Sequence, residues 1–219
     1  MLSAVEVETA PNPTRSVIWL HGLGADGHDF EPAVPYLHQS GGPALRFVFP
    51  HAPVRPVTLN GGLPMRAWYD IGALNRQAPQ DEAGVRAADA SVRALIAREN
   101  ERGIATGHIV LAGFSQGGAL ALYTGTRLPE KLAGVVGLSC YILLAESFAA
   151  ERQAANQHTP FFLGHGTQDP VVVPELGAEA RAQLAASGYD VEWHDYAMAH
   201  SVCAEELAHI GAFLQRVMR

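Results

Sequence analysis

The stretch HIVLAGFSQGGALALYTGTRL, residues 108–128, decides the fold of this chain. Residues 108–114 form a short apolar run, as expected for a strand that is buried on both faces. Residues 116–128 continue as a helical run. Between the two stands a G-x-S-x-G motif with Ser115 at its centre. Five residues alone are a weak signal, but a strand before them and a helix after them are typical of a nucleophile elbow.

Ser115 is therefore the candidate nucleophile. A turn this tight leaves no room for side chains at Gly113 and Gly117, and it holds the serine in a strained backbone conformation. The hydroxyl then points outward at the amino end of the helix, where the helix dipole favours a developing anion. The alternative is a glycine-rich turn in which Ser115 only caps the helix. The strand and helix around the motif favour the nucleophile.

Short apolar runs alternate with longer helical ones along the rest of the chain. The expected strands are residues 16–21, 44–50, 108–114, 132–139, 159–166 and 189–196, and the expected helices are residues 29–40, 81–102, 116–128, 175–187 and 202–219. This order predicts a mostly parallel central sheet with helices on both faces. The last strand alternates in part, which suits an edge position. Together with the elbow, the pattern predicts an α/β-hydrolase fold.

Length and composition limit what the chain can be. Its 219 residues fit one domain, residues 1–219, and 48% apolar and 17% charged residues are ordinary for a globular protein. A net charge of −7 without a basic cluster argues against nucleic acid as a partner and against docking on anionic membranes. No apolar stretch is long enough to span a bilayer, so we expect no stable membrane insertion.

Cysteine usage and the N-terminus bear on the compartment. Two cysteines, Cys140 and Cys203, do not indicate a disulfide framework. The first residues show no signal-peptide pattern. Together these observations predict a cytoplasmic protein.

The loop after the first expected strand, residues 21–27 (HGLGADG), is the candidate oxyanion hole. Acyl transfer places negative charge on the carbonyl oxygen, and two backbone N–H groups aimed at that oxygen stabilise it. Gln116, the residue after the nucleophile, would supply one amide, and Leu23 the other. An ordinary glycine-rich loop is the alternative. A dinucleotide site fits less well, because the G-x-G-x-x-G pattern is not met.

A neutral serine needs a base, usually histidine. In this fold the chain order is serine, then acid, then histidine. His200 lies between the last expected strand and the last expected helix, which is the place where the base belongs. The other histidines that follow the serine fit less well, since His194 lies inside a strand and His209 is expected to be a solvated residue of the last helix.

Asp169 is the candidate acid, because it directly follows the strand of residues 159–166 and precedes His200. It would hold the imidazole in one tautomer and stabilise the imidazolium. The alternative is an aspartate that only shapes a turn before Pro170. Asp190 and Asp195 are weaker rivals. Residues 51–80 and 140–158 break the alternation, and long irregular excursions of this kind are often functional loops.

The motifs HGLGAD, PHAPVRPVTLNGG followed by AWYDI, DEAGV, AGFSQGG and HGTQDPVV, with a late His-Ser before the last helix, together resemble the phospholipase/carboxylesterase family. This family includes bacterial carboxylesterases and eukaryotic acyl-protein thioesterases. The resemblance runs from about Val17 to the C-terminus. It implies an α/β-hydrolase without a large cap domain, with the triad and the oxyanion donors on the residues named above.

The resemblance also implies that Met65 and Trp68 help to line the acyl pocket. The HGLGAD motif is more similar to the motif of the bacterial carboxylesterase branch than to that of the thioesterase branch. Cys140 departs from the family, which usually has glycine between Ser139 and Tyr141. This leaves open the shape of the loop at residues 140–158, and with it the preferred chain length.

These observations predict a serine carboxylesterase that hydrolyses short- to medium-chain esters of small molecules through an acyl-enzyme. We expect no metal and no cofactor. Two alternatives stay open: an acyl-protein thioesterase or lysophospholipase with the same triad, and a non-catalytic ligand receptor on the hydrolase fold. The sequence also leaves open whether the protein is a homodimer.

Overall fold

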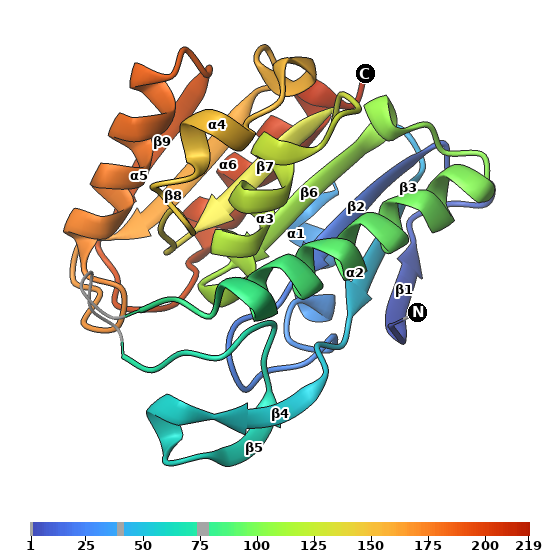
Figure 1. The fold of residues 1–219 in the computed structure, drawn as a ribbon. Helices are drawn as coiled ribbons and strands as arrows, with labels where there is room; N and C mark the ends of the chain where they lie inside the picture. Colours follow the sequence, from blue (N-terminus) through green and yellow to red (C-terminus); the bar gives the residue numbers. More distant parts are fainter. Residues whose placement is uncertain (1, 39–41, 74–78) are drawn as a thin grey trace.

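A computed structural model describes residues 2–38, 42–73 and 79–219. Its centre is a seven-stranded sheet in the order β1-β3-β2-β6-β7-β8-β9. The strands are β1 (Ala4–Glu8), β2 (Arg15–Leu20), β3 (Leu45–Pro50), β6 (Ile109–Phe114), β7 (Gly134–Leu138), β8 (Phe161–Gly166) and β9 (Val191–Tyr196). A separate hairpin, β4 (Val54–Val57) and β5 (Leu63–Arg66), projects from the body of the molecule (Figure 1).

Helices cover both faces of the sheet, which confirms the predicted fold class (Figure 1). The longer helices are α2 (Glu82–Glu101), α3 (Gln116–Arg127), α5 (Pro174–Ala186) and α6 (Ala204–Val217), and the short ones are α1 (Val34–Leu37) and α4 (Phe148–Glu151). Single turns of 3-10 helix are η1 (Glu31–Ala33), η2 (Thr58–Asn60), η3 (Thr106–His108) and η4 (Ala154–Asn156). α2, α3 and α5 lie on one face, and α1 and α6 lie on the other.

All the strands expected from sequence are present and pair in parallel. β9 lies at an edge of the sheet, as predicted. β1 was not predicted. It pairs antiparallel with β3 and forms the opposite edge. Glu8 on β1 bonds to Arg46 of β3, and Glu6 bonds to Arg98 of α2 and to Arg102 directly after α2.

Two expectations need correction. The helix expected at residues 29–40 is replaced by η1 and α1, because Pro32 and Pro35 fit only the first turn of a helix; residues 39–40 lie outside the described part. His209 is half-buried and not solvated. Its Nδ1 lies 3.0 Å from the Tyr196 hydroxyl, and its ring stacks on His194 with the ring centroids 4.5 Å apart.

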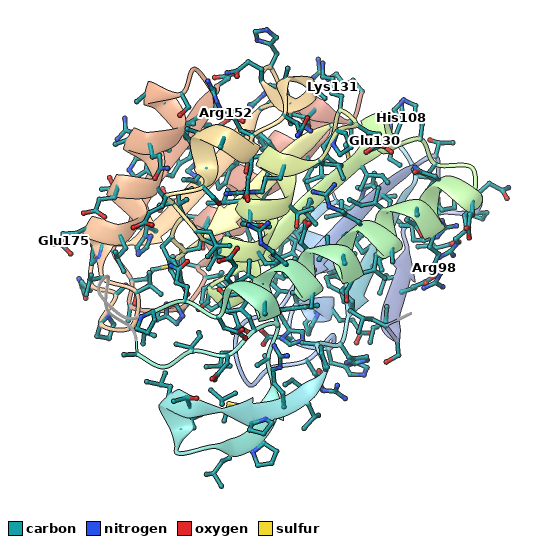
Figure 2. All side chains as sticks on the ribbon, in the orientation of Figure 1. Arg98, His108, Glu130, Lys131, Arg152 and Glu175 are labelled. Carbon is teal, nitrogen blue, oxygen red and sulfur yellow. The ribbon has the colours of Figure 1, made fainter. Side chains whose placement is uncertain are left out.

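The core lies on both faces of the sheet. Along β6, Ile109 and Leu111 face the cluster under α2 and α3, whereas Val110 and Ala112 face the cluster under α6. Alternate side chains of one strand are thus buried in two different layers, which explains why the strand reads as a continuous apolar run. The exposed charged residues Glu130, Lys131 and Arg152 lie at the end away from the β4–β5 hairpin (Figure 2).

The turn from β6 to α3 is held by unusually close backbone contacts. A Cβ atom at Gly113 would lie 2.3 Å from the Gly117 carbonyl oxygen, and one at Gly117 would lie 2.2 Å from that of Leu20. Ser115 between them has φ 55° and ψ −119°, in the left-handed region that side chains disfavour. The sequence prediction of a strained elbow matches this geometry.

Glu206 on α6 is fully buried, and neither carboxyl oxygen has a hydrogen-bond partner. It packs over Gly164 of β8 and beside Tyr196 of β9. Burial raises the pKa of Glu206 to about 8, so the folded protein holds a neutral carboxyl at pH 7. In the unfolded chain the same group ionises near its ordinary pKa. Between these two pKa values the folded state binds the extra proton, and stability falls as pH rises.

We therefore expect Glu206→Gln to remove a pH-dependent loss of stability. Relative to the wild type, the variant should gain roughly 3–5 kcal/mol of unfolding free energy between about pH 4.5 and 8, because Gln does not ionise. Denaturant unfolding at several pH values measures this difference. Glu205→Gln, at an exposed neighbour, is the control. Parallel stability profiles for the wild type and Glu206→Gln would contradict the prediction.

Candidate active site

Three side chains from separate segments form one hydrogen-bonded chain. The Ser115 hydroxyl lies 2.9 Å from His200 Nε2, and His200 Nδ1 lies 2.7 Å from Asp169 Oδ2. Ser115 comes from the elbow after β6, Asp169 from the loop after β8, and His200 from the segment between β9 and α6. The carboxyl ends of parallel strands meet at one edge of the sheet, so the topology brings the three predicted residues together.

The Asp169 carboxylate is buried and fixed by its own loop. Oδ1 accepts hydrogen bonds from the Val171 and Val172 amides at 2.8 and 2.9 Å, while Oδ2 faces His200. Three donors therefore set the direction of this acceptor, and His200 is left with Nε2 free to face Ser115. Asp190 and Asp195, the rivals considered from sequence, are both exposed on or beside β9.

His165 supports the acid loop, a role that sequence reasoning did not assign. It is buried at the end of β8, and its Nε2 lies 2.8 Å from the Val172 carbonyl oxygen and 3.7 Å from Asp169 Oδ2. Its ring packs closely against Gly177 of α5. Its position four residues before Asp169 was the available signal, because the end of β8 leads directly into the loop that carries Asp169.

The ring of Phe114 covers the imidazole of His200. The two ring centroids lie 4.7 Å apart, and Phe30 packs behind Phe114 at 5.9 Å. Phe114 occupies the variable position before the serine, where the motif sets no residue type. A ring face next to the base is favourable for a positively charged imidazolium.

Of the two predicted oxyanion donors, Gln116 directly follows the serine and Leu23 lies in the loop after β2. Gln116 begins α3, so its amide has no acceptor inside the helix. Gly22 lies against the serine, since a Cβ there would be 3.5 Å from Ser115 Cβ. Within the described ranges, no protein acceptor takes the Leu23 or the Gln116 amide proton. Both amides are therefore available to a substrate oxygen.

Trp68 packs behind this loop, and its predicted place in the wall of the acyl pocket stays a prediction. It is buried, its backbone amide donates to Gln116 Oε1 at 2.8 Å, and its indole N–H donates to the His21 carbonyl oxygen at 2.9 Å. Trp68 thus connects the two segments that carry the predicted oxyanion donors. Met65 is half-buried beside Gly24, in the same part of the molecule, and its predicted contact with substrate stays a prediction.

A cavity of about 860 Å³ lies one residue away from the triad, because its wall contains direct neighbours of the site but not Ser115, Asp169 or His200 themselves. Its apolar wall includes Tyr69, Ile71, Tyr141, Leu143, Val172 and Leu176. It reaches the nucleophile helix through the Tyr69 hydroxyl, which donates to the Gln116 carbonyl oxygen at 3.4 Å, and the acid loop through Val172. Much of the wall comes from the two irregular segments that the sequence indicated as functional loops; residues 74–78 of the first lie outside the described part.

Cys140 does not take part in this chemistry. It is buried against Gly118 and Gly137, and burial raises the pKa of its thiol well above the ordinary value. A neutral buried thiol acts as a small apolar group.

Among the described residues there is no cluster of His, Cys, Asp and Glu that could hold a metal ion, and no helix is long and apolar enough to cross a membrane.

Comparison with known proteins identifies the family and the fold. The family model described as Phospholipase/Carboxylesterase matches residues 3–218. Acyl-protein thioesterase 1 of Neurospora crassa is 41% identical over 210 residues, which cover 92% of this chain and 86% of that protein. The crystal structure of Arabidopsis thaliana SOBER1 is 31% identical with a TM-score of 0.87, over 94% of this chain and 99% of that one. The crystal structure of esterase PE8 is 29% identical with a TM-score of 0.84, over 99% of both chains.

Replacement of Asp169 by Asn tests the hydrogen-bonded chain. The Asn amide would donate to His200 Nδ1 and impose the wrong tautomer, so ester turnover should fall roughly 10³–10⁴-fold without loss of the fold. The measurement is kcat for a p-nitrophenyl ester. The control is Asp195→Asn, an exposed carboxylate on β9, which should leave kcat unchanged. A small effect of Asp169→Asn would show that this carboxylate does not orient the base.

Proposed function

The chain belongs to the phospholipase/carboxylesterase family, and we propose that it hydrolyses short- to medium-chain carboxylic esters with Ser115 as its nucleophile. Family membership makes it a serine hydrolase of esters or thioesters. The observation that carries the proposal is the unbroken hydrogen-bonded chain from Ser115 through His200 to Asp169. We also propose that residues 1–219 form one domain, since both core clusters lie on the faces of one sheet.

The proposed mechanism has two halves. His200 Nε2 takes the proton of Ser115 while the hydroxyl oxygen attacks the ester carbonyl carbon, and the Leu23 and Gln116 amides hold the oxyanion. His200 then gives the proton to the leaving alcohol, and an acyl-enzyme remains. Water, activated by the same imidazole, attacks this acyl group and releases the acid. Asp169 keeps its charge throughout and stabilises the imidazolium.

The 860 Å³ cavity near the triad is the proposed site for the acyl chain. Its wall combines apolar side chains such as Ile71, Leu143 and Leu176 with polar ones, and the apolar part suits a hydrocarbon chain. Acidic side chains such as Asp81 and Glu82 are also among the residues that line it. Such a cavity favours an acyl group that is longer than acetyl.

An acyl-protein thioesterase activity is the second candidate, because the Neurospora crassa relative carries that name. The same triad and cavity would serve a thioester, which differs only in the leaving group. A non-catalytic receptor is less well supported, since the hydrogen-bonded chain to Ser115 is complete. The cytoplasmic setting stays a prediction, and the homodimer stays open.

The deciding experiment compares p-nitrophenyl acetate, butyrate, octanoate and palmitate with a palmitoyl thioester and a lysolipid, for the wild type and Ser115→Ala. We expect turnover of the shorter esters by the wild type and a loss of several powers of ten in the variant. Preference for the palmitoyl thioester would favour the second candidate. Equal activity of both proteins, or no activity and no reaction with an organophosphonate, would rule out Ser115 as the nucleophile.

Filling the cavity should change chain-length preference. Leu176→Trp adds bulk on the wall that α5 contributes, so kcat/KM for octanoate should fall about tenfold or more relative to that for acetate. The control is Ala178→Trp, which adds the same side chain at an exposed position of α5 outside the cavity wall. An unchanged octanoate-to-acetate ratio in Leu176→Trp would place the acyl chain elsewhere.

A further inference from the structure

We propose that His21 is a positioning residue for the oxyanion hole: its imidazole fixes the peptide whose N–H group is the Leu23 donor. The inference rests on the proposed function and adds a residue to it. Sequence reasoning treated His21 only as the first letter of a glycine-rich loop. The structure places its ring in contact with the loop itself.

Both nitrogens of the His21 ring make a hydrogen bond, and each partner determines whether that nitrogen carries a proton. Nδ1 lies 2.7 Å from the Gly22 carbonyl oxygen, which can only accept, so Nδ1 carries the proton. Nε2 lies 3.0 Å from the Ala52 amide nitrogen, which donates, so Nε2 carries no proton. Only the neutral ring with hydrogen on Nδ1 satisfies both contacts. Burial lowers the pKa of His21, which keeps the ring in this neutral form.

The bond from Nδ1 acts on the oxyanion donor because the peptide group is planar. The Gly22 carbonyl and the Leu23 N–H belong to one trans peptide, so they point in opposite directions. Holding the carbonyl toward the imidazole turns the Leu23 N–H away from it. Gly22 itself lies against Ser115, as the 3.5 Å approach to Ser115 Cβ shows. The Ala25 amide also donates to the Gly22 oxygen, at 3.3 Å, a longer and weaker contact.

The imidazole is itself fixed from the other side. The Ala52 amide holds Nε2, and the indole N–H of Trp68 holds the His21 carbonyl oxygen at 2.9 Å. The ring is buried and packs against Trp68 at a tilt of 39°, with 5.3 Å between the ring centroids. A side chain fixed in this way can hold the neighbouring peptide without moving during the reaction, as preorganised stabilisation requires.

Two amide variants separate the roles of the two nitrogens. Asn carries its amide on Cγ, where it can replace the Nδ1 donor, whereas the Gln amide lies one carbon further out and can replace only Nε2. The probe is kcat and KM for p-nitrophenyl butyrate, together with the inhibition constant of a butyl trifluoromethyl ketone. That ketone forms a tetrahedral adduct with the serine and places its oxyanion in the hole.

We expect His21→Gln and His21→Ala to lower kcat roughly 10–100-fold, with KM changed less than threefold, and to weaken the ketone by a similar factor. His21→Asn should stay within about fivefold of the wild type in both measurements. His51→Gln is the control, because His51 accepts from Gly27 in the same loop without touching the Gly22 carbonyl. Its kcat should stay unchanged.

The inference is overturned if His21→Gln turns over ester as fast as the wild type, or if His21→Asn loses as much as His21→Ala. Nitrogen NMR of the wild type needs no variant: a His21 ring protonated on Nε2, or on both nitrogens, at pH 7 would also overturn it. A wild type that hydrolyses no ester would refute the proposed function, whereas an active wild type with unaffected variants would refute only the role of His21.

Discussion

The active site depends on how closely the backbone of α3 approaches the ends of β2 and β6. Gly117 touches the Leu20 carbonyl, and Gly113 touches the Gly117 carbonyl, at distances that allow no side chain. Because β2 continues directly into the loop of Gly22 and Leu23, this contact also sets the separation between the two proposed oxyanion donors. A single steric constraint therefore positions the proposed nucleophile and the amides around it together.

Around this contact, each working group is held by hydrogen bonds from its own neighbourhood. The Asp169 carboxylate is oriented by the amides that follow it, and the Gln116 side chain bonds to Trp68 and Tyr69. Trp68 connects that side chain to the loop at His21. The irregular segment that carries Trp68 is thus part of the support of the site as well as part of the cavity wall. Such support costs no rearrangement when substrate charge develops.

The features that could be predicted were those that short sequence patterns determine. The elbow at Ser115, the buried strands and the chain order of acid and base follow from short patterns with a physical cause. β1 was missed because its side chains are only half-buried and the partner of Glu6, Arg98 of α2, lies far away in the sequence. The contacts of Trp68 could not be predicted from the sequence. The residues next to it in the chain are compatible with an indole that lines a pocket and equally with one that bridges two loops.

The left-handed backbone of Ser115 has a consequence for how this protein can evolve. A residue held at φ 55° costs of the order of 1–3 kcal/mol, a cost that glycine at that position would largely avoid. Glycine, however, has no hydroxyl. Selection for a more stable fold and selection for turnover therefore act in opposite directions at position 115. Stabilising substitutions have to accumulate at other positions of the chain.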